Sequence, residues 1–317
     1  MNIIKYLRFK NKVLNVPDGD PDPRDWEMKT ELLKEVQSDE ALKEFSRQDF
    51  TPHVKNQGSI GSCVGHSGRV VYGDTQEFED KEPSPMWIYK NGKKHDPFPG
   101  EDYSGTTIRG ACTALRNVGC CEESFWPDKQ SEDAPMLDGA EENAIQYKTN
   151  AYYAIKANDH KLIKRALLHE PLWTSFKVHY NFYYTPSSGI VKSDGYSESK
   201  YAGGHAVAMV GWKYINDNLY WQFQNSWGTR FGNEGFFFME ASLYEKIIIN
   251  SIGPYYLAVK SEGENGKFLS EEERKKKEEE RRKREEDNKK EKKKKNKKSM
   301  AIVAGVILLV GFIYSLT

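Results

Sequence analysis

The sequence predicts an α+β fold with two lobes, and three observations support this class. Apolar residues in the first half of the globular region recur at helical spacing, over 63–75 and 106–118. Strand-like runs rich in aromatic and β-branched residues dominate the second half. The hydrophobic content of 38% and the aromatic content of 13% are enough to build a buried core. The strand-like runs are AYYAI (151–155), PLWTSFKV (171–178), HAVAMVGW (205–212), LYWQFQ (219–224), GFFFM (235–239) and YYLAV (255–259).

Composition divides the 317-residue chain into four parts. Residues 1–50 are predicted to form an extended N-terminal segment, because three prolines and four aspartates lie within 15–27. Residues 51–260 have a globular composition and are predicted to form one domain. A charged spacer follows over 261–299, and an apolar segment over 300–316.

The first 16 residues alternate basic or polar residues with apolar ones. This stretch contains no apolar run long enough for a secretory signal. We interpret it as an edge strand or a loose arm. Because only 50 residues precede the predicted domain, we also do not expect activation by removal of a long inhibitory propeptide.

The C-terminal part of the sequence predicts a membrane tether. Residues 268–299 consist almost wholly of Glu, Lys and Arg, which cannot bury a core but suit either a solvated single helix or a disordered linker. Residues 300–316 carry no charge, at the short end for a membrane span. We predict a single transmembrane helix here rather than a core helix, because the spacer separates it from any core. The basic cluster before it predicts that the globular domain faces the cytoplasm.

The distribution of charge argues against nucleic-acid binding. Lys and Arg total 47, as do Asp and Glu, and residues 261–300 hold 17 of the basic and 12 of the acidic ones. The rest of the chain therefore has 30 basic and 35 acidic residues, so the globular part offers no basic face.

Four cysteines occur, at positions 63, 112, 120 and 121. Their spacing is unlike that of a disulfide framework, so we expect thiols and a reducing compartment. Cys120 and Cys121 are adjacent, and no histidine lies nearby in the sequence. We therefore predict no metal site and no other cofactor.

One cysteine has the surroundings of a nucleophile, in VKNQGSIGSCVGHS (54–67). Gly58 and Gly61 permit an unusual backbone just before an apolar helical stretch. Cys63 then falls at a helix start, where backbone N–H groups favour the nucleophilic thiolate. Gln57 lies six residues earlier, and its amide can donate to an oxyanion beside the Cys63 N–H. The alternative is that Cys63 is simply a small hydrophobic residue of the buried core.

Two later segments supply a partner histidine and asparagine. In GGHAVAMVGW (203–212), His205 follows two glycines and stands at the start of an apolar strand. In WQFQNSWGTRFGNEGFFFM (221–239), Asn225 ends a strand and precedes Trp227. An asparagine can orient a histidine ring by hydrogen bonding, and an indole over that contact excludes water. Taken singly, each segment also suits a structural histidine or an ordinary turn.

Together the three segments resemble the papain family of cysteine peptidases. QGSxGSC, GGHAV and NSWGTxFGNEGF occur in the family's order, 142 residues apart from cysteine to histidine and 20 from histidine to asparagine. The early VPDGDPDPRD resembles the start of a microbial and viral branch. The resemblance covers about residues 16–259, and it implies a helical lobe packed beside a β-barrel-like lobe.

The resemblance also implies roles for individual residues. Cys63 would be the nucleophile, His205 the general base and then acid, and Asn225 the residue that orients His205. Gln57 would help form the oxyanion hole, with Cys63 and His205 resting as a thiolate–imidazolium pair. Further residues are implied in substrate binding, namely Ser104, Gly105 and Trp227, the last as a shield over the His205–Asn225 contact. The implied reaction is hydrolysis of a polypeptide substrate through a thioester.

Some residues depart from the family pattern, and other functions stay open. Val64 stands where a tryptophan is usual, which changes helix packing without removing a catalytic group. His66, one turn after Cys63, is an alternative base. Two alternative functions use the same fold, a catalytically silent binding module and a transpeptidase or amide ligase whose acyl-enzyme is intercepted by an amine.

Overall fold

The computed structural model describes residues 3–17, 27–28, 42–75, 81–98, 103–128, 133, 135–193, 201–249 and 253–259. All of these residues belong to one compact unit, Met1–Lys260. The predicted spacer (261–299) and the predicted transmembrane helix (300–316) lie outside the described residues. Within the described ranges, no helix has both the length and the apolar character that crossing a bilayer requires.

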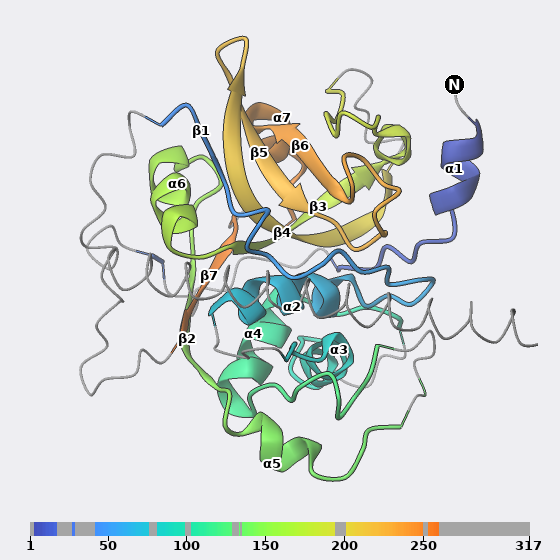
Figure 1. The fold of residues 1–317 in the computed structure, drawn as a ribbon, viewed down its shortest axis with the longest axis vertical. Coiled ribbons are helices and arrows are strands. Elements are labelled where there is room, and N and C mark those ends of the chain that lie inside the picture. Colours follow the sequence, from blue (N-terminus) through green and yellow to red (C-terminus); the bar gives the residue numbers. More distant parts are fainter. Residues whose placement is uncertain are drawn as a thin grey trace, which may run out of the picture. The chain divides into compact units, whose positions relative to one another are not determined.

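The domain combines helices and one sheet, which confirms the predicted α+β class (Figure 1). Helices of its first half are α2 (Cys63–Thr75), α3 (Pro85–Lys93), α4 (Ile108–Asn117) and α5 (Ala140–Ala144). Strands are β1 (Glu44–Ser46), β2 (Thr149–Ala154), β3 (Leu172–His179), β4 (Tyr201–Ile215), β5 (Asn218–Gln224), β6 (Phe236–Glu240) and β7 (Tyr255–Val259). Between strands lie α6 (His160–His169), the 3-10 helix η3 (Tyr180–Tyr184) and α7 (Ala241–Ile247). The helices predicted over 63–75 and 106–118 and all six predicted strands are present. Apolar residues at helical spacing also suggested a helix over 26–48, but within that range Glu44–Ser46 form strand β1.

The strands form a seven-stranded antiparallel sheet in the order β2-β7-β3-β4-β5-β6, with β1 paired to β4. The long strand β4 carries β3 on one side and β5 on the other. His205 pairs with Phe176 of β3, and Ala208 pairs with Gln224 of β5. Asn225 directly follows β5, so the sheet brings the predicted histidine and asparagine to neighbouring strands.

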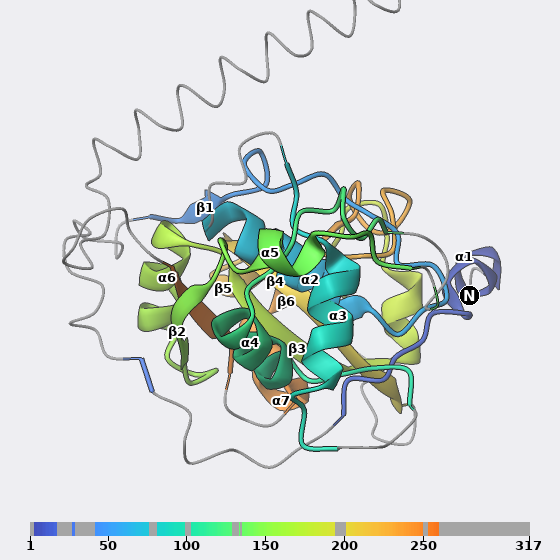
Figure 2. The same ribbon diagram turned by 90° about the horizontal axis from the view of Figure 1, so that it is seen from below.

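Helices α2, α3 and α4 gather on one side of the sheet, as Figures 1 and 2 show. Glycines let α2 approach its neighbours closely. A Cβ at Gly68 would lie 2.5 Å from the ring of Trp173 in β3, and a Cβ at Gly65 would collide with the backbone oxygen of Pro85 in α3. The indole N–H of Trp173 also donates to Ser67 Oγ at 2.7 Å. These contacts fix the start of α2, where Cys63 lies, against α3 and the sheet.

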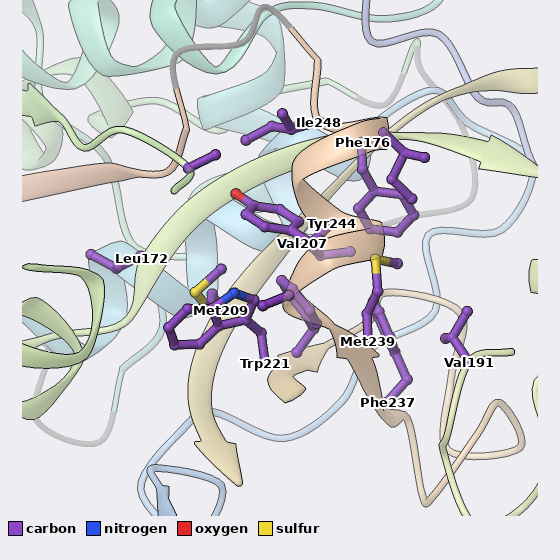
Figure 3. Packing of buried hydrophobic residues seen from close by; sticks show 14 of the residues in the cluster. Leu172, Phe176, Val191, Val207, Met209, Trp221, Phe237, Met239, Tyr244 and Ile248 are labelled. Carbon is purple, nitrogen blue, oxygen red and sulfur yellow. The ribbon is translucent and has the colours of Figure 1, made fainter. Parts of the chain in front are cut away.

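Side chains on the other face of the sheet form a second core with α7. Alternate residues of β4 divide between the two faces, with Val207 and Met209 on this side and Ala206 and Ala208 facing α2. Figure 3 shows the aromatic and sulfur-containing members of this core packed closely together. Phe176, Trp221, Phe237, Met239 and Tyr244 belong to it. A rigid sheet therefore supports the histidine-bearing strand.

The N-terminal segment differs from the predicted extended arm. Residues Ile3–Phe9 form helix α1. The following residues are neither an edge strand of the sheet nor a loose arm, because Leu14 and Val16 are buried and Asn15 makes an isolated bridge to Gly204. Burial of apolar side chains against the domain holds this segment in place.

Candidate active site

Cys63 is the first residue of α2 and has 1% of its surface exposed. The loop before the helix turns at Gly58, whose φ of +64° lies in the left-handed region that favours glycine. At Gly61 the backbone passes close to Ser104, and the Gly61 N–H donates to Ser104 Oγ at 3.1 Å. Backbone N–H groups of Val64 and Ala206 hydrogen-bond to the thiol. Ala206 directly follows His205, so the thiol contacts the strand that carries the predicted base.

His205 and Asn225 form the predicted pair. His205 Nε2 lies 2.8 Å from Asn225 Oδ1, and both residues are buried. The backbone N–H of Ser226 donates to the same Oδ1 at 2.8 Å, which identifies this atom of the amide as the oxygen. An oxygen can only accept, so Nε2 must carry the ring proton. In the neutral ring Nδ1 is then the basic nitrogen, and it has no hydrogen-bond partner among the described residues.

Gln57 is tied to the residue after Asn225. Its Nε2 donates to Ile60 O at 2.9 Å, and its Oε1 accepts from Ser226 Oγ at 2.6 Å. The backbone N–H of Gln57 donates to Ser226 O at 2.8 Å. One hydrogen of Gln57 Nε2 is donated to Ile60 O, and the amide nitrogen carries a second hydrogen that it can donate. Ser226 thus joins the Cys63 loop to the asparagine, a link that the sequence analysis missed although the Asn-Ser-Trp run contains it.

Trp227 packs over the histidine, as the sequence predicted for a shield. Its ring lies 5.0 Å from that of His205, and 2% of its surface is exposed. Tyr183 stacks on it at 5.5 Å, and Phe9 of α1 stacks on it at 5.6 Å. These rings exclude water from the His205–Asn225 contact.

Ser104 contacts the loop before α2, and Gly105 lies beside the N-terminal segment. The resemblance implied that they bind the backbone of a substrate. In the structure the Gly105 N–H donates to Tyr89 Oη at 3.2 Å, and a Cβ at Gly105 would lie 2.8 Å from Asn15 Cβ. The protein's own N-terminal segment is therefore the peptide that lies against Gly105.

The charge state of the closed site differs from the expected thiolate–imidazolium pair. Burial raises the pKa of the Cys63 thiol to about 11, although hydrogen bonds from backbone N–H groups oppose the rise. Burial also lowers the pKa of His205 to about 4, against the effect of its bond to Asn225. Both groups therefore rest neutral in this form. The helix start favours a thiolate as predicted, but desolvation outweighs it.

The other reactive side chains are engaged elsewhere. His66, the alternative base, is buried with Nε2 3.1 Å from Asp128 Oδ2 and Nδ1 3.0 Å from Ser62 O. None of the four cysteines forms a disulfide, and all are buried. Within the described ranges, no group of three or more His, Cys, Asp or Glu side chains is arranged to hold a metal ion.

The fold and the site together define a class. A cysteine at a helix start, in contact with the strand of a histidine whose Nε2 is bound by asparagine, supplies the residue types of a cysteine hydrolase. The chain belongs to the papain family of cysteine proteases, whose family pattern matches residues 43–257. This confirms the resemblance drawn from the motifs, and a protease of this family acts on polypeptides.

Individual relatives agree with this assignment. The chain is 28% identical to cathepsin B-like cysteine proteinase 3 of Caenorhabditis elegans over 280 residues, which is 74% of this chain and 72% of that protein. It is 29% identical to a peptidase C1-like protein of Acanthamoeba polyphaga mimivirus over 58% of this chain and 63% of that one. The crystal structure of xylellain, a cysteine protease from Xylella fastidiosa, has the same fold. That comparison gives a TM-score of 0.63 at 21% identity, over 79% of this chain and 97% of the other.

Proposed function

We propose that this protein is a cysteine endopeptidase that hydrolyses peptide bonds through a thioester acyl-enzyme. The observation that carries the proposal is the double acceptor role of Asn225 Oδ1, which receives hydrogen bonds from Ser226 N and His205 Nε2. It fixes the tautomer that leaves Nδ1 basic, the nitrogen suited to removing the proton of the thiol.

In the proposed catalytic cycle, these residues act in turn. Cys63 Sγ attacks the scissile carbonyl carbon while its proton passes to His205 Nδ1. The backbone N–H of Cys63 and the second Nε2 hydrogen of Gln57 stabilise the oxyanion. As the tetrahedral intermediate collapses, His205 protonates the leaving amine, and the thioester remains on Cys63. A water molecule deprotonated by His205 then hydrolyses the thioester and restores the thiol.

Product analysis of the full chain tests the reaction type. The protein in detergent micelles is incubated with an unfolded polypeptide such as casein in H₂¹⁸O, with and without an added primary amine. We expect internal cuts whose new carboxyl termini carry one ¹⁸O from solvent, and no amine adducts. Cys63→Ala should abolish the cuts, whereas Cys112→Ala, which removes a buried thiol of α4, should retain them. Products capped by the amine would establish a transpeptidase, and equal cleavage by Cys63→Ala would overturn the proposal.

The proposal includes a C-terminal membrane anchor with the peptidase domain on the cytoplasmic side. Its support is the sequence of residues 300–316, which lacks charge, and the basic cluster that immediately precedes it. Such a tether confines cleavage to polypeptides near the membrane.

Liposome flotation tests the anchor. The full chain is expected to float with phosphatidylcholine vesicles containing phosphatidylserine, and to stay bound in about 1 M NaCl, where the Debye length is about 3 Å. A variant that ends at residue 299 should sediment in high salt, because the basic cluster alone binds through screened charges. Equal flotation of both proteins at high salt would place the attachment elsewhere in the chain.

A further inference from the structure

A small polar cavity lies beside Asn225, and the proposed catalytic cycle does not use it. The cavity has room for about one water molecule. Its polar lining includes Lys55, Arg69 of helix α2, Gln224 of β5, Asn225 and Ser226. What this cavity binds therefore bears directly on the residue that orients His205.

Three of the side chains that line the cavity each have one polar atom without a hydrogen-bond partner among the described residues. These atoms are Arg69 Nε, Gln224 Oε1 and Asn225 Nδ2. None of the three residues is more than 2% exposed. Nearly all buried polar groups in native proteins are bonded to protein atoms or to ordered water, so the three atoms indicate a ligand for the cavity.

Other hydrogen bonds establish which atom of each amide is left for that ligand. Gln224 Nε2 donates to Pro52 O at 2.7 Å, so the amide oxygen of Gln224 remains. The Ser226 N–H donates to Asn225 Oδ1 at 2.8 Å, so the amide nitrogen of Asn225 remains. The two amides therefore offer one acceptor and one donor to the cavity.

The guanidinium of Arg69 contributes a second donor. Its Nη1 donates to Glu82 Oε2 at 2.6 Å, and its Nη2 donates to His53 O. Of its three nitrogens, Nε alone has no partner within the described part of the chain. Arg69 lies in the helix that begins at Cys63, so the cavity joins the helix of the nucleophile to the asparagine.

Two donors and one acceptor suit a water molecule better than an ion. The N–H groups repel a metal cation, and one of them belongs to a charged guanidinium. Gln224 Oε1 repels an anion. The positive charges of the lining are also neutralised, because Arg69 and Lys55 pair with Glu82 at 2.6 Å and 3.4 Å. A water molecule can both accept and donate, and buried waters typically make about three hydrogen bonds.

We propose that the cavity binds one water molecule, which accepts hydrogen bonds from Arg69 Nε and Asn225 Nδ2 and donates one to Gln224 Oε1. Arg69 and Gln224 are then positioning residues, which act on catalysis through Asn225. Their effect on catalysis rests on the proposed peptidase function, whereas the water site itself does not.

The water restrains the torsion that aims the asparagine amide at the histidine. Rotation about the Cβ–Cγ bond of an asparagine has a broad energy profile, so hydrogen bonds rather than a rotamer well set the plane of the amide. With Asn225 Nδ2 held by the water and Oδ1 held by the Ser226 N–H, both ends of the amide are fixed. Oδ1 then stays aligned with His205 Nε2, which lies 2.8 Å away.

Solvent exchange of the His205 Nε2 hydrogen tests the water site without relying on peptidase activity. The full chain in detergent micelles is labelled with ¹⁵N-histidine and ¹⁵N-asparagine, and exchange is followed by NMR. The signals of His205 and Asn225 are assigned by their loss in the alanine variants. Gln224→Met keeps a side chain of similar length but removes the acceptor for the water. We expect the hydrogen to exchange about two- to tenfold faster in this variant, the effect of losing one hydrogen bond.

Gln222→Met is the matched control. Gln222 lies two residues earlier on the same strand, is buried, and donates to Gln48 Oε1 at 2.8 Å. It is not among the residues that line the cavity, so this variant should exchange at the rate of the wild type. Circular dichroism verifies that each variant is folded.

Two further measurements complete the test. Nuclear Overhauser effects between the side-chain amide hydrogens of Asn225 and a long-lived water are expected in the wild type and in Gln222→Met. If Gln224→Met does not fold, Arg69→Lys replaces it, because lysine keeps the positive charge beside Glu82 and lacks the Nε–H. In peptide cleavage, either variant should lose about two- to tenfold in kcat with little change in KM, because the amide acts on the histidine and not on the bound substrate.

The results separate the two proposals. Faster exchange in Gln224→Met or Arg69→Lys, together with the Overhauser effects, supports the water site even if no variant cleaves peptides, an outcome that would contradict only the peptidase. Absence of the Overhauser effects in the wild type overturns the water site. Exchange at the wild-type rate in both variants also overturns it, whether or not peptides are cleaved.

Discussion

Replacing His205 with alanine is expected to lower kcat/KM for peptide cleavage by about 10²–10⁴-fold, the range that a positioned general acid–base group contributes. The loss has two parts, because the histidine takes the proton of the Cys63 thiol and later gives it to the leaving amine. Without it, the thiol stays protonated, since burial already raises its pKa to about 11. Steady-state cleavage of a fluorogenic peptide by the protein with and without the substitution gives the measurement.

The Cys63→Ala/His205→Ala double variant should be no slower than Cys63→Ala alone. Groups that act as one catalytic unit have strongly non-additive effects, and the histidine has no thiol to activate once Cys63 is gone. His160→Ala is the matched control, because His160 lies on α6 and pairs with Glu245 at 2.7 Å. Activity that survives His205→Ala but disappears in His66→Ala would reassign the base to the histidine of α2.

The contact between His205 and Asn225 was predictable because a hairpin converts their spacing into proximity. The two residues are 20 positions apart, and strands β4 and β5 between them are joined at Asn216 and Asp217, which have φ values of +48° and +62°. Positive φ at both central residues is the geometry of a tight two-residue turn. Antiparallel pairing from that turn brings the end of β5, which Asn225 follows, back toward the part of β4 that carries His205.

The departure at Val64 also has a simple structural meaning. Val64 is fully buried in the core between α2 and the sheet. The position therefore contributes to packing, and a valine can take the place of the usual tryptophan there. Its backbone N–H still hydrogen-bonds to the Cys63 thiol. The substitution therefore leaves the hydrogen bonds of the nucleophile in place.

The position of the N-terminal segment was not predictable from its own sequence. Its alternation of polar and apolar residues suits an edge strand equally well, and its partners, such as Gly105 and Gly204, are distant in the chain. The charge state of Cys63 was missed for the same reason. A helix start is visible in the sequence, whereas burial depends on which segment covers the thiol.

Replacing Gln57 with alanine is expected to lower kcat by about 10²–10³-fold, the cost of losing one oxyanion donor, with little change in KM. The oxyanion exists only in the transition state, so the substrate in its ground state does not lose a contact. Gln57→Glu is the matched variant, because it keeps the shape and replaces the donor with an acceptor, and it should be as slow as Gln57→Ala. Steady-state kinetics of both variants measure the two parameters separately.

Ser226→Ala distinguishes the donor from the residue that holds it. This change removes the hydrogen bond from Ser226 Oγ to Gln57 Oε1 but leaves Gln57 Nε2 bonded to Ile60 O and the Ser226 N–H bonded to Asn225 Oδ1. A single neutral hydrogen bond contributes about 0.5–1.5 kcal/mol, so the expected loss in kcat is about tenfold or less. A loss as large as that of Gln57→Ala would contradict the role of Gln57 as an oxyanion donor. It would mean that Gln57 acts by holding Ser226 and Asn225 in place.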